Sequence, residues 1–259
     1  MNRSLWTAAT GMGSQQLNMD IIANNLANVN TVGFKKSRAN FVDLMYQTLQ
    51  SPGATTAGAT NVPNGIQIGM GTRIVDVQKM FTQGEFVQTG NDLDLVIEGR
   101  GFFKILRNDE EVYTRAGAFK LDKEGYICDP EGYRLQPEMR IPPDAVNISI
   151  DPQGNISVIG QDGTEIASGE IRLYNFINPA GLLSLGRSYY LPTEASGEPI
   201  EGTPGEDALG TINQGYLENA NVSIVQEMVD MIVAQRAYEA TSKVIKTSDE
   251  MMQIANNLR

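Results

Sequence analysis

The feature that most constrains this chain is a pair of apolar stripes, one near each end. The N-terminal stripe has heptad spacing and consists of Leu5, Ala8, Met12, Met19, Ile22, Leu26 and Val29. A similar set follows near the C-terminal end: Val225, Val229, Val233, Ala237, Val244, Met251, Ile254 and Leu258. Such spacing predicts helices that bury a seam against other helices. We therefore expect helices over residues 4–29 and 223–258, packed as a coiled-coil-like inner domain.

The acidic charge of the chain lies between these two stripes. Residues 73–210 hold 12 Lys and Arg against 23 Asp and Glu, whereas the flanking residues hold 8 of each sign. Neutral apolar helices around an acidic middle indicate a subunit that polymerises through its termini. The net charge of −11 argues against nucleic acid and anionic lipid as partners. No apolar run is long enough to insert in a membrane.

Histidine is absent from the sequence and cysteine occurs once, at Cys128. Without histidine the chain has no Ser-His-Asp or Cys-His catalysis and no His-ligated metal. A single cysteine excludes an internal disulfide. We expect no catalytic residue, no cofactor and no metal. The first 30 residues lack an apolar core with a cleavage-like site, so we also expect no cleaved signal peptide.

The middle of the chain changes to a period of two, with short apolar runs between turn signals. The runs are Asp94–Ile97, Phe102–Leu106, Val112–Arg115, Ala118–Leu121, Asn147–Ile150, Ile156–Ile159 and Ile171–Phe176. This pattern predicts a central antiparallel β-domain, which makes the fold class α+β.

We expect three parts in the chain. Residues 1–31 and 222–259 form the helical inner domain, residues 32–72 and 210–221 form a connector, and residues 73–209 form the β-rich outer domain. In the connector, Gly33 is expected to stop the first helix, and residues 40–50 are expected to be a short helix or an extended arm. Residues 51–65 are expected to form a loop or irregular hairpin, and residues 192–210 an exposed loop.

Four asparagines crowd the end of the first predicted helix: Asn24, Asn25, Asn28 and Asn30. Asparagine is a poor helix former, so the cluster needs a reason. One interpretation is a frayed, solvated helix end. The other is a hydrogen-bonding ladder that fixes the register between packed chains.

Other candidate sites have simpler structural explanations. Asp92, Asp94 and Glu98 are carboxylates that can pair for glycoside hydrolysis, but strand alternation favours a solvated acidic face. Gly99 and Gly101 favour a bulge or a close approach of strands rather than a nucleotide site. The turn after Asp122 resembles only a fragment of a calcium loop.

Four segments carry a family resemblance. Residues 23–35 (ANNLANVNTVGFK), 99–103 (GRGFF), 113–119 (YTRAGAF) and 227–239 (EMVDMIVAQRAYE) resemble the signatures of bacterial flagellar rod and hook proteins. The resemblance covers essentially the whole chain in the right order. Within the family, the chain length and an insert between Ser51 and Gly69 are most similar to those of distal-rod members. The residues of this rod-specific segment are Tyr46, Leu49, Pro52, Gly53, Val62, Pro63 and Gly65.

The resemblance implies a structural subunit of a hollow helical drive shaft. It implies terminal helices inside the tube, with subunit interfaces at the two apolar stripes and at Asn24, Asn25 and Asn28. The implied partners are further copies of the chain, proximal rod and hook subunits, the surrounding L- and P-ring proteins, and the flagellar type III export apparatus. The implied location is the basal body, across the periplasm and cell wall.

Two alternatives remain. In the first alternative, the chain is a proximal rod or hook subunit of the same family. From a different class, it is a secreted β-domain carbohydrate-binding protein or hydrolase on a two-helix stalk. A neutral channel lining is a further hypothesis, with uncharged positions Gln235, Ser242, Ser248, Gln253, Asn256 and Asn257 facing the channel.

Overall fold

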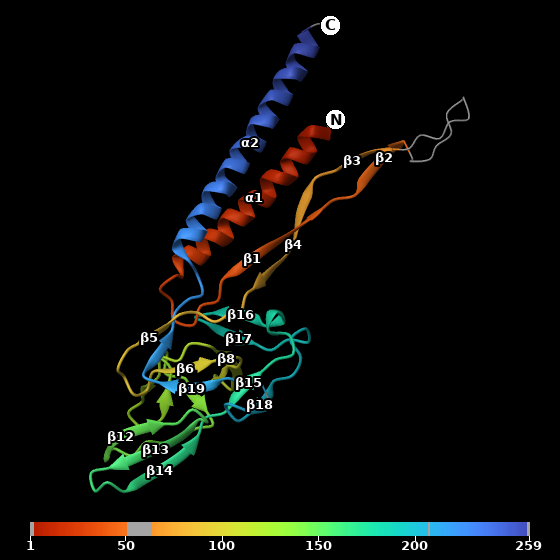
Figure 1. The fold of residues 1–259 in the computed structure, drawn as a ribbon. Coiled ribbons are helices and arrows are strands. Elements are labelled where there is room, and N and C mark those ends of the chain that lie inside the picture. Colours follow the sequence, from red (N-terminus) through yellow and green to blue (C-terminus); the bar gives the residue numbers. More distant parts are fainter. Residues whose placement is uncertain (1–2, 51–63, 207, 258–259) are drawn as a thin grey trace. The chain divides into compact units, whose positions relative to one another are not determined.

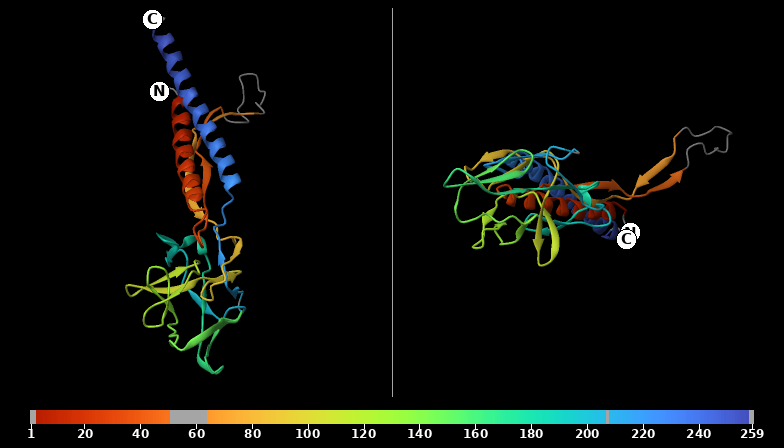
Figure 2. Two further views of the ribbon diagram at one scale, coloured as in Figure 1. Left: turned by 90° about the vertical axis from the view of Figure 1, so that its left-hand side faces the viewer. Right: turned by 90° about the horizontal axis from the view of Figure 1, so that it is seen from below.

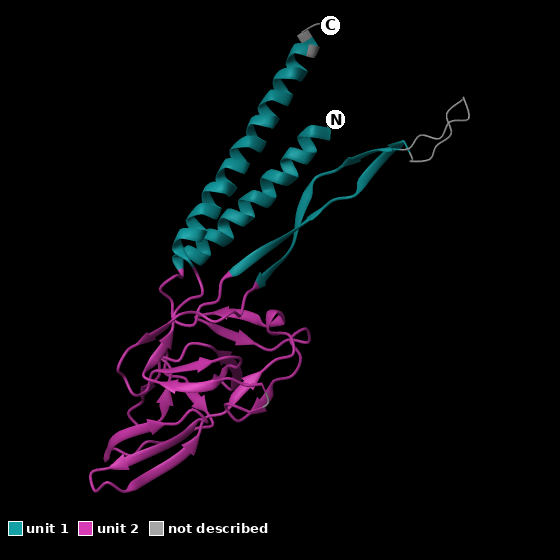
Figure 3. Ribbon diagram, in the orientation of Figure 1, with its two compact units in different colours: residues 1–27, 37–78, 223–259 teal, residues 28–36, 79–222 magenta. Residues whose placement is uncertain are grey.

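The computed structural model describes residues 3–50, 64–206 and 208–257 (Figure 1). The chain forms two compact units (Figure 3). We call residues 1–27, 37–78 and 223–259 the helical unit, and residues 28–36 and 79–222 the β unit. Most of the predicted connector is thus grouped with the helices. The three-part division of the chain remains a prediction.

Both predicted terminal helices are confirmed. Helix α1 spans Arg3–Ala27 and helix α2 spans Ile224–Asn257. They lie side by side and run in opposite directions (Figures 1 and 2). Helix α1 ends earlier than expected because Asn28 begins a turn. The Thr31 amide donates to the Asn28 carbonyl at 3.0 Å, and the Thr31 hydroxyl donates to the Asn28 side chain at 3.2 Å.

Gly33 does not stop the helix, contrary to our expectation. It lies beyond the turn with a φ of +69°, and its amide donates to the Glu218 carbonyl at 2.8 Å. A Cβ at this position would come within 2.6 Å of the Ala116 amide nitrogen. Glycine is therefore required here by the packing of the β unit as well as by the backbone conformation.

The described residues 37–50 and 64–78 form an extended arm of the helical unit. Strand β1 (Ser37–Asp43) pairs with β4 (Thr72–Lys79), and β2 (Tyr46–Gln50) pairs antiparallel with β3 (Ile66–Gly69). The extended alternative for residues 40–50 is therefore confirmed, and the helical one is wrong. The arm lies close to α1, because a Cβ on Gly71 would come within 2.1 Å of the Thr10 hydroxyl oxygen.

The β unit is built around a seven-stranded antiparallel sheet in the order β16-β17-β8-β7-β11-β10-β9. Its strands are β7 (Phe103–Arg107), β8 (Glu110–Thr114), β9 (Lys120–Leu121), β10 (Ile127–Cys128), β11 (Arg134–Gln136), β16 (Leu183–Gly186) and β17 (Tyr189–Leu191). A three-stranded antiparallel sheet follows the order β12 (Ala145–Ile150), β13 (Asn155–Gly160) and β14 (Glu165–Glu170). The remaining strands form antiparallel pairs: β5 (Phe86–Gln88) with β20 (Tyr216–Glu218), β6 (Leu95–Glu98) with β19 (Thr211–Gln214), and β15 (Leu173–Asn175) with β18 (Ile200–Gly202).

All seven predicted runs contain part of a strand, so the central antiparallel β-domain is confirmed. The expectation of an exposed loop at 192–210 is wrong in part. This segment contains β18, and it buries Ser196 and Leu209. The Ser196 hydroxyl closes a local turn by donating to the Thr193 carbonyl at 2.8 Å, which offsets the cost of its burial.

Two hydrophobic clusters form the core of the β unit. The larger is mainly aliphatic and includes Ile105, Val112 and Ile156. The smaller is aromatic: Phe102, Tyr113, Tyr174, Phe176 and Tyr190 pack around Leu182, with Phe81 against them. The rings meet edge to face, for instance Tyr113 with Phe176 at 5.0 Å between centroids. The buried charges described below lie in the same unit.

Candidate assembly surface

Within one chain, α1 and α2 meet along small and polar side chains. The Ser4 and Ser248 hydroxyl oxygens are 3.3 Å apart, and a Cβ on Gly11 would lie 3.7 Å from the Thr241 methyl group. On α2 the buried Ala234 lies at the same heptad position, seven residues before Thr241. At these positions the contact is made by small and polar side chains, and the large apolar Ile22 of α1 is also buried. Ser248 faces α1, so its proposed place in a channel lining is wrong.

The predicted apolar stripe of α2 is consequently left uncovered. Val225 is 73% exposed, Val233 is 61% exposed and Met251 is 60% exposed. The other exposed members of the stripe are Val229, Val244 and Ile254. Ala237 is half-buried. Large apolar side chains in such a contiguous stripe mark an interaction surface.

The predicted stripe of α1 is covered to a greater extent. Ala8 and Ile22 are buried, and the other predicted positions are half-buried: Leu5, Met12, Met19, Leu26 and Val29. Further apolar side chains lie exposed beside the predicted stripe of α2: Ile224, Met228, Ile232 and Met252. Their signal was present as a second set of apolar positions along the same helix.

Asn25 joins three elements of the helical unit. Its side chain exchanges two hydrogen bonds of 2.9 Å with the Ser37 backbone at the start of β1. The same amide group donates to Glu227 of α2 at 3.2 Å. Asn25 is only 2% exposed, so it is not part of a frayed end. Asn28 holds the turn after α1, and Asn24 is exposed.

The arm carries the second exposed apolar surface. Tyr46 and Leu49 are exposed in β2, and Gly65 is half-buried. Further exposed apolar side chains of the arm are Phe41, Met45, Ile66, Ile68, Met70, Val75 and Val77. The remaining predicted residues lie outside the described part of the chain: Pro52, Gly53, Val62, Pro63 and Leu258. A two-stranded ribbon is marginally stable alone, so this arm needs a covering surface.

A buried ionic cluster lies within the β unit. Lys35 Nζ is 2.7 Å from one oxygen of Glu218, and Arg115 Nε is 2.8 Å from the other. The Glu218 side chain is 1% exposed and also accepts a hydrogen bond from the Gly84 amide at 2.8 Å. The cluster thus binds together the segments just after α1, before β5, after β8 and before α2.

The excess positive charge of this cluster is offset by backbone carbonyls. The Arg115 guanidinium donates to the carbonyls of Ile97 at 2.9 Å, and of Gly99 and Gly101 at 2.5 Å each. Burial by itself raises the pKa of Glu218, but the charges of Arg115 and Lys35 outweigh it and hold that pKa below its usual range. Burial also lowers the pKa of Lys35, against the opposing effect of Glu218.

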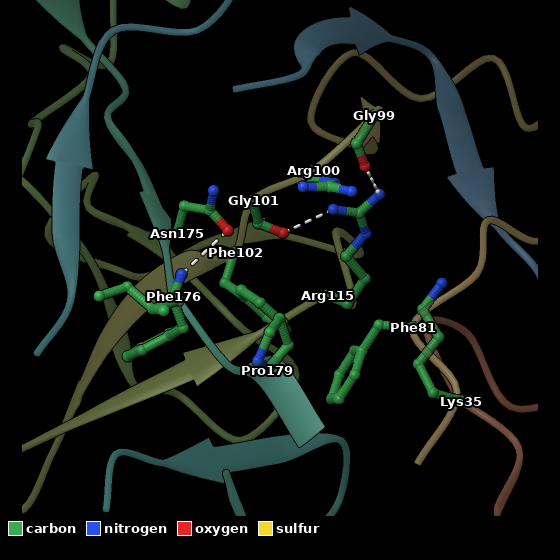
Figure 4. Close-up of a pocket in the computed structure, with 11 residues that line it drawn as sticks. Lys35, Phe81, Gly99, Arg100, Gly101, Phe102, Arg115, Asn175, Phe176 and Pro179 are labelled. Carbon is green, nitrogen blue, oxygen red and sulfur yellow. Dashed lines mark hydrogen bonds between the residues drawn. The ribbon is translucent and has the colours of Figure 1, made fainter. Parts of the chain in front are cut away.

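A pocket of about 300 Å³ borders the cluster. Figure 4 shows the Arg115 side chain turned toward the carbonyls of Gly99 and Gly101, with Phe81 and Phe102 nearby. No carboxylate occurs among the described residues that line this pocket, so it lacks a general acid–base pair. The described residues also contain no cluster of ligands able to hold a metal ion. In that part of the chain, no helix has the length and apolarity needed to cross a bilayer.

The acidic residues considered for hydrolysis do not form one solvated face, contrary to our expectation. Asp94 is buried and accepts hydrogen bonds from the Thr89 hydroxyl at 2.5 Å and the Asn91 amide at 3.0 Å. Asp92 and Glu98 are exposed. Asp94 therefore shapes a turn. Gly99 does lie at a close approach of strands, since a Cβ there would come within 2.9 Å of the Gly210 Cα.

Comparison with known proteins connects this architecture to the flagellum. Three family models match in chain order: the flagella basal body rod protein (residues 5–35), the flagellar hook protein FlgE/F/G D1 domain (96–158) and the flagellar basal body rod FlgEFG protein C-terminal region (213–258). The flagellar basal-body rod protein FlgG of Borreliella burgdorferi is 48% identical, over 100% of this chain and 99% of its own length.

Two relatives from Caulobacter vibrioides allow a comparison within one organism. Its basal-body rod protein FlgG is 43% identical, over 99% of both chains, and its basal-body rod protein FlgF is 32% identical, over 98% of this chain and 97% of that one. The chain belongs to the flagellar basal-body rod protein family. It is therefore a structural protein and not an enzyme, as the sequence predicted.

Each of the three matched regions contributes one residue to the buried ionic cluster. Lys35 lies in the first matched region, Arg115 in the second and Glu218 in the third. Sequence reasoning quoted the segments of Lys35 and Arg115 as family signatures but did not foresee their contact. Glu218, which precedes α2, carried no signal in the sequence, because a single carboxylate in a strand is unremarkable.

Proposed function

We propose that this rod protein is a subunit of the distal rod, which polymerises through its helical unit into a hollow helical tube. The tube would transmit torque from the motor to the hook. The observation that carries the proposal is the uncovered apolar stripe of α2, which includes Val225, Val233 and Met251. The higher identity to the FlgG relatives than to FlgF supports a distal position rather than a proximal one.

Energetics support assembly through the helical unit. Burying one large aliphatic side chain contributes about 1.5–3 kcal/mol, so a stripe of such side chains can drive association. The helical unit has 7 Lys and Arg against 8 Asp and Glu, whereas the β unit has 13 against 23. Near-neutral surfaces associate more readily than surfaces of one sign. A coiled-coil-like inner core of terminal helices, with the acidic β units outside, satisfies both conditions.

The partners follow from this placement. Copies of the chain would contact one another through the two apolar stripes and the arm, with Asn24 and Asn28 near the end of α1. The ends of the tube would meet proximal rod and hook subunits. The L- and P-ring proteins would surround it in the periplasm and cell wall, and export would use the flagellar type III apparatus. Non-closing contacts between identical subunits give a helical tube rather than a ring.

Electron microscopy of the purified chain at rising concentration tests the proposal. We expect straight tubes. Persistently monomeric protein, or small closed oligomers, would contradict it. Hydrogen exchange gives a second test, because helices with little cover are marginal in water and order on assembly. Amides of residues 3–27 and 224–257 should exchange faster in the monomer than in tubes, where neighbouring subunits cover the helices. Equal exchange rates in monomer and tubes would argue against ordering on assembly.

A further inference from the structure

Three contacts between α1 and α2 share one register. The residue numbers of each contacting pair add up to the same value: Ser4 with Ser248, Gly11 with Thr241, and Asn25 with Glu227. Successive members of each set are separated by one or two heptads. The two helices therefore face each other along one heptad-spaced line of small or polar residues.

Most of this line does not distinguish one register from another. A shift of α2 by one heptad moves it about 10 Å along α1. After such a shift, the serine, threonine and alanine positions of α2 again oppose the serine and glycine positions of α1. Small side chains fit in either register, because they interlock little with the side chains of the facing helix.

The Asn25–Glu227 pair is the exception. Both side chains are buried, and the Glu227 carboxylate accepts its hydrogen bond from Asn25 at 3.2 Å. In the register that brings Ser248 opposite Gly11, Asn25 would face Ala234 and Glu227 would lie beyond the end of α1 at Ala27, so these two side chains would lose each other as partners. Asn25 is also tied to the start of β1 by two hydrogen bonds.

We propose that Asn25 and Glu227 are positioning residues that select the register of the two terminal helices. They thereby fix the axial position of the apolar stripe of α2 relative to α1 and the arm. This last consequence rests on the proposed function, whereas the register itself is a property of one chain.

Engineered cysteine pairs can report the register in dilute, monomeric protein carrying Cys128→Ser. The pair Ser4→Cys with Ser248→Cys reports the observed register, since the parent hydroxyls are 3.3 Å apart. The pair Gly11→Cys with Ser248→Cys reports a register shifted by one heptad. Non-reducing gels measure the yield of each disulfide. Each pair is placed in three backgrounds: native, Glu227→Gln, and Asn25→Leu with Glu227→Leu.

We expect only the first disulfide in the native background and with Glu227→Gln, because a glutamine oxygen still accepts from Asn25. The double leucine variant should raise the ratio of shifted to observed disulfide about 100-fold. An unchanged ratio would overturn the proposal, as would a shifted disulfide in the native background. Loss of both disulfides in the leucine variant would also overturn it, since the pair would then supply stability rather than register. None of these readouts requires polymers, so they are independent of the proposed function.

Discussion

At the residue scale, the decisive features are buried polar groups with complete sets of partners. The Glu218 carboxylate accepts from Lys35, Arg115 and the Gly84 amide, whereas the Asn25 side chain donates to Glu227 and exchanges two hydrogen bonds with the Ser37 backbone. In both cases one side chain connects segments that are distant in sequence. Removing one partner of a buried ion pair leaves an uncompensated charge, which costs about 3–5 kcal/mol. Such positions are therefore the ones at which a single conservative change has a large effect.

Glu218→Gln should destabilise the β unit by about 3–5 kcal/mol near neutral pH. The folded pKa of Glu218 is lowered from its ordinary value of 4.5, so its contribution is present above that pH and is lost as pH falls through the folded pKa. Thermal unfolding followed by circular dichroism between about pH 7 and about pH 3 measures both effects. The Glu218→Gln variant should lose part of the pH dependence of its thermal stability. Asp92→Asn, at an exposed position, is the matched control, and an equal effect of both changes would contradict this account.

At the element scale, each long helix has two different faces. One face of α2 meets α1 through Glu227, Thr241 and Ser248, and a wider face carries uncovered valines, isoleucines and methionines. The division explains how helices within one chain can pack and still leave apolar surface for neighbours. A helix that is apolar over more than a narrow stripe needs several neighbours.

Met251→Asp should leave the monomer folded and prevent polymerisation. Met251 is largely exposed in the single chain, so the aspartate is tolerated there, but in the tube it would be a buried and unpaired carboxylate in every subunit. Light scattering and circular dichroism measure the two properties. Leu26→Asp should also prevent assembly. Gln235→Asp, at an exposed polar position of the same helix, should assemble normally. If the Met251→Asp variant still forms tubes, Met251 does not lie in the interface between subunits.

At the scale of the whole molecule, charge is divided unequally between the two units. The β unit carries 13 basic and 23 acidic residues, so neighbouring β units in a tube would repel one another. The Debye length falls from about 30 Å at 0.01 M salt to about 8 Å at 0.15 M. We therefore expect the critical concentration for assembly to fall as salt rises over this range, as measured by sedimentation. A rise in critical concentration would show that attractive ion pairs dominate assembly.

Deleting residues 50–62 should permit assembly but give curved or flexible tubes. The segment extends from an arm whose exposed side chains, such as Tyr46, Leu49 and Ile66, need cover from neighbouring subunits. When clamped between subunits, the arm would prevent the sliding that a curved tube requires. Electron microscopy gives the curvature of the product. Straight, stiff tubes from the deletion variant would reject this role for the arm.

The sequence by itself determined the terminal helices, the antiparallel middle and the family, because periodicity and turn residues are local signals. Only the tertiary structure decided which helix face is used inside the chain. The heptad pattern predicted a seam of large apolar residues. In the structure, α1 contacts α2 through Ser4, Gly11 and Asn25, each one position before a residue of that predicted seam. It likewise decided that Asp94 is buried and that Glu218 joins Lys35 to Arg115. These outcomes depend on which distant segments meet, and no local pattern contains that information.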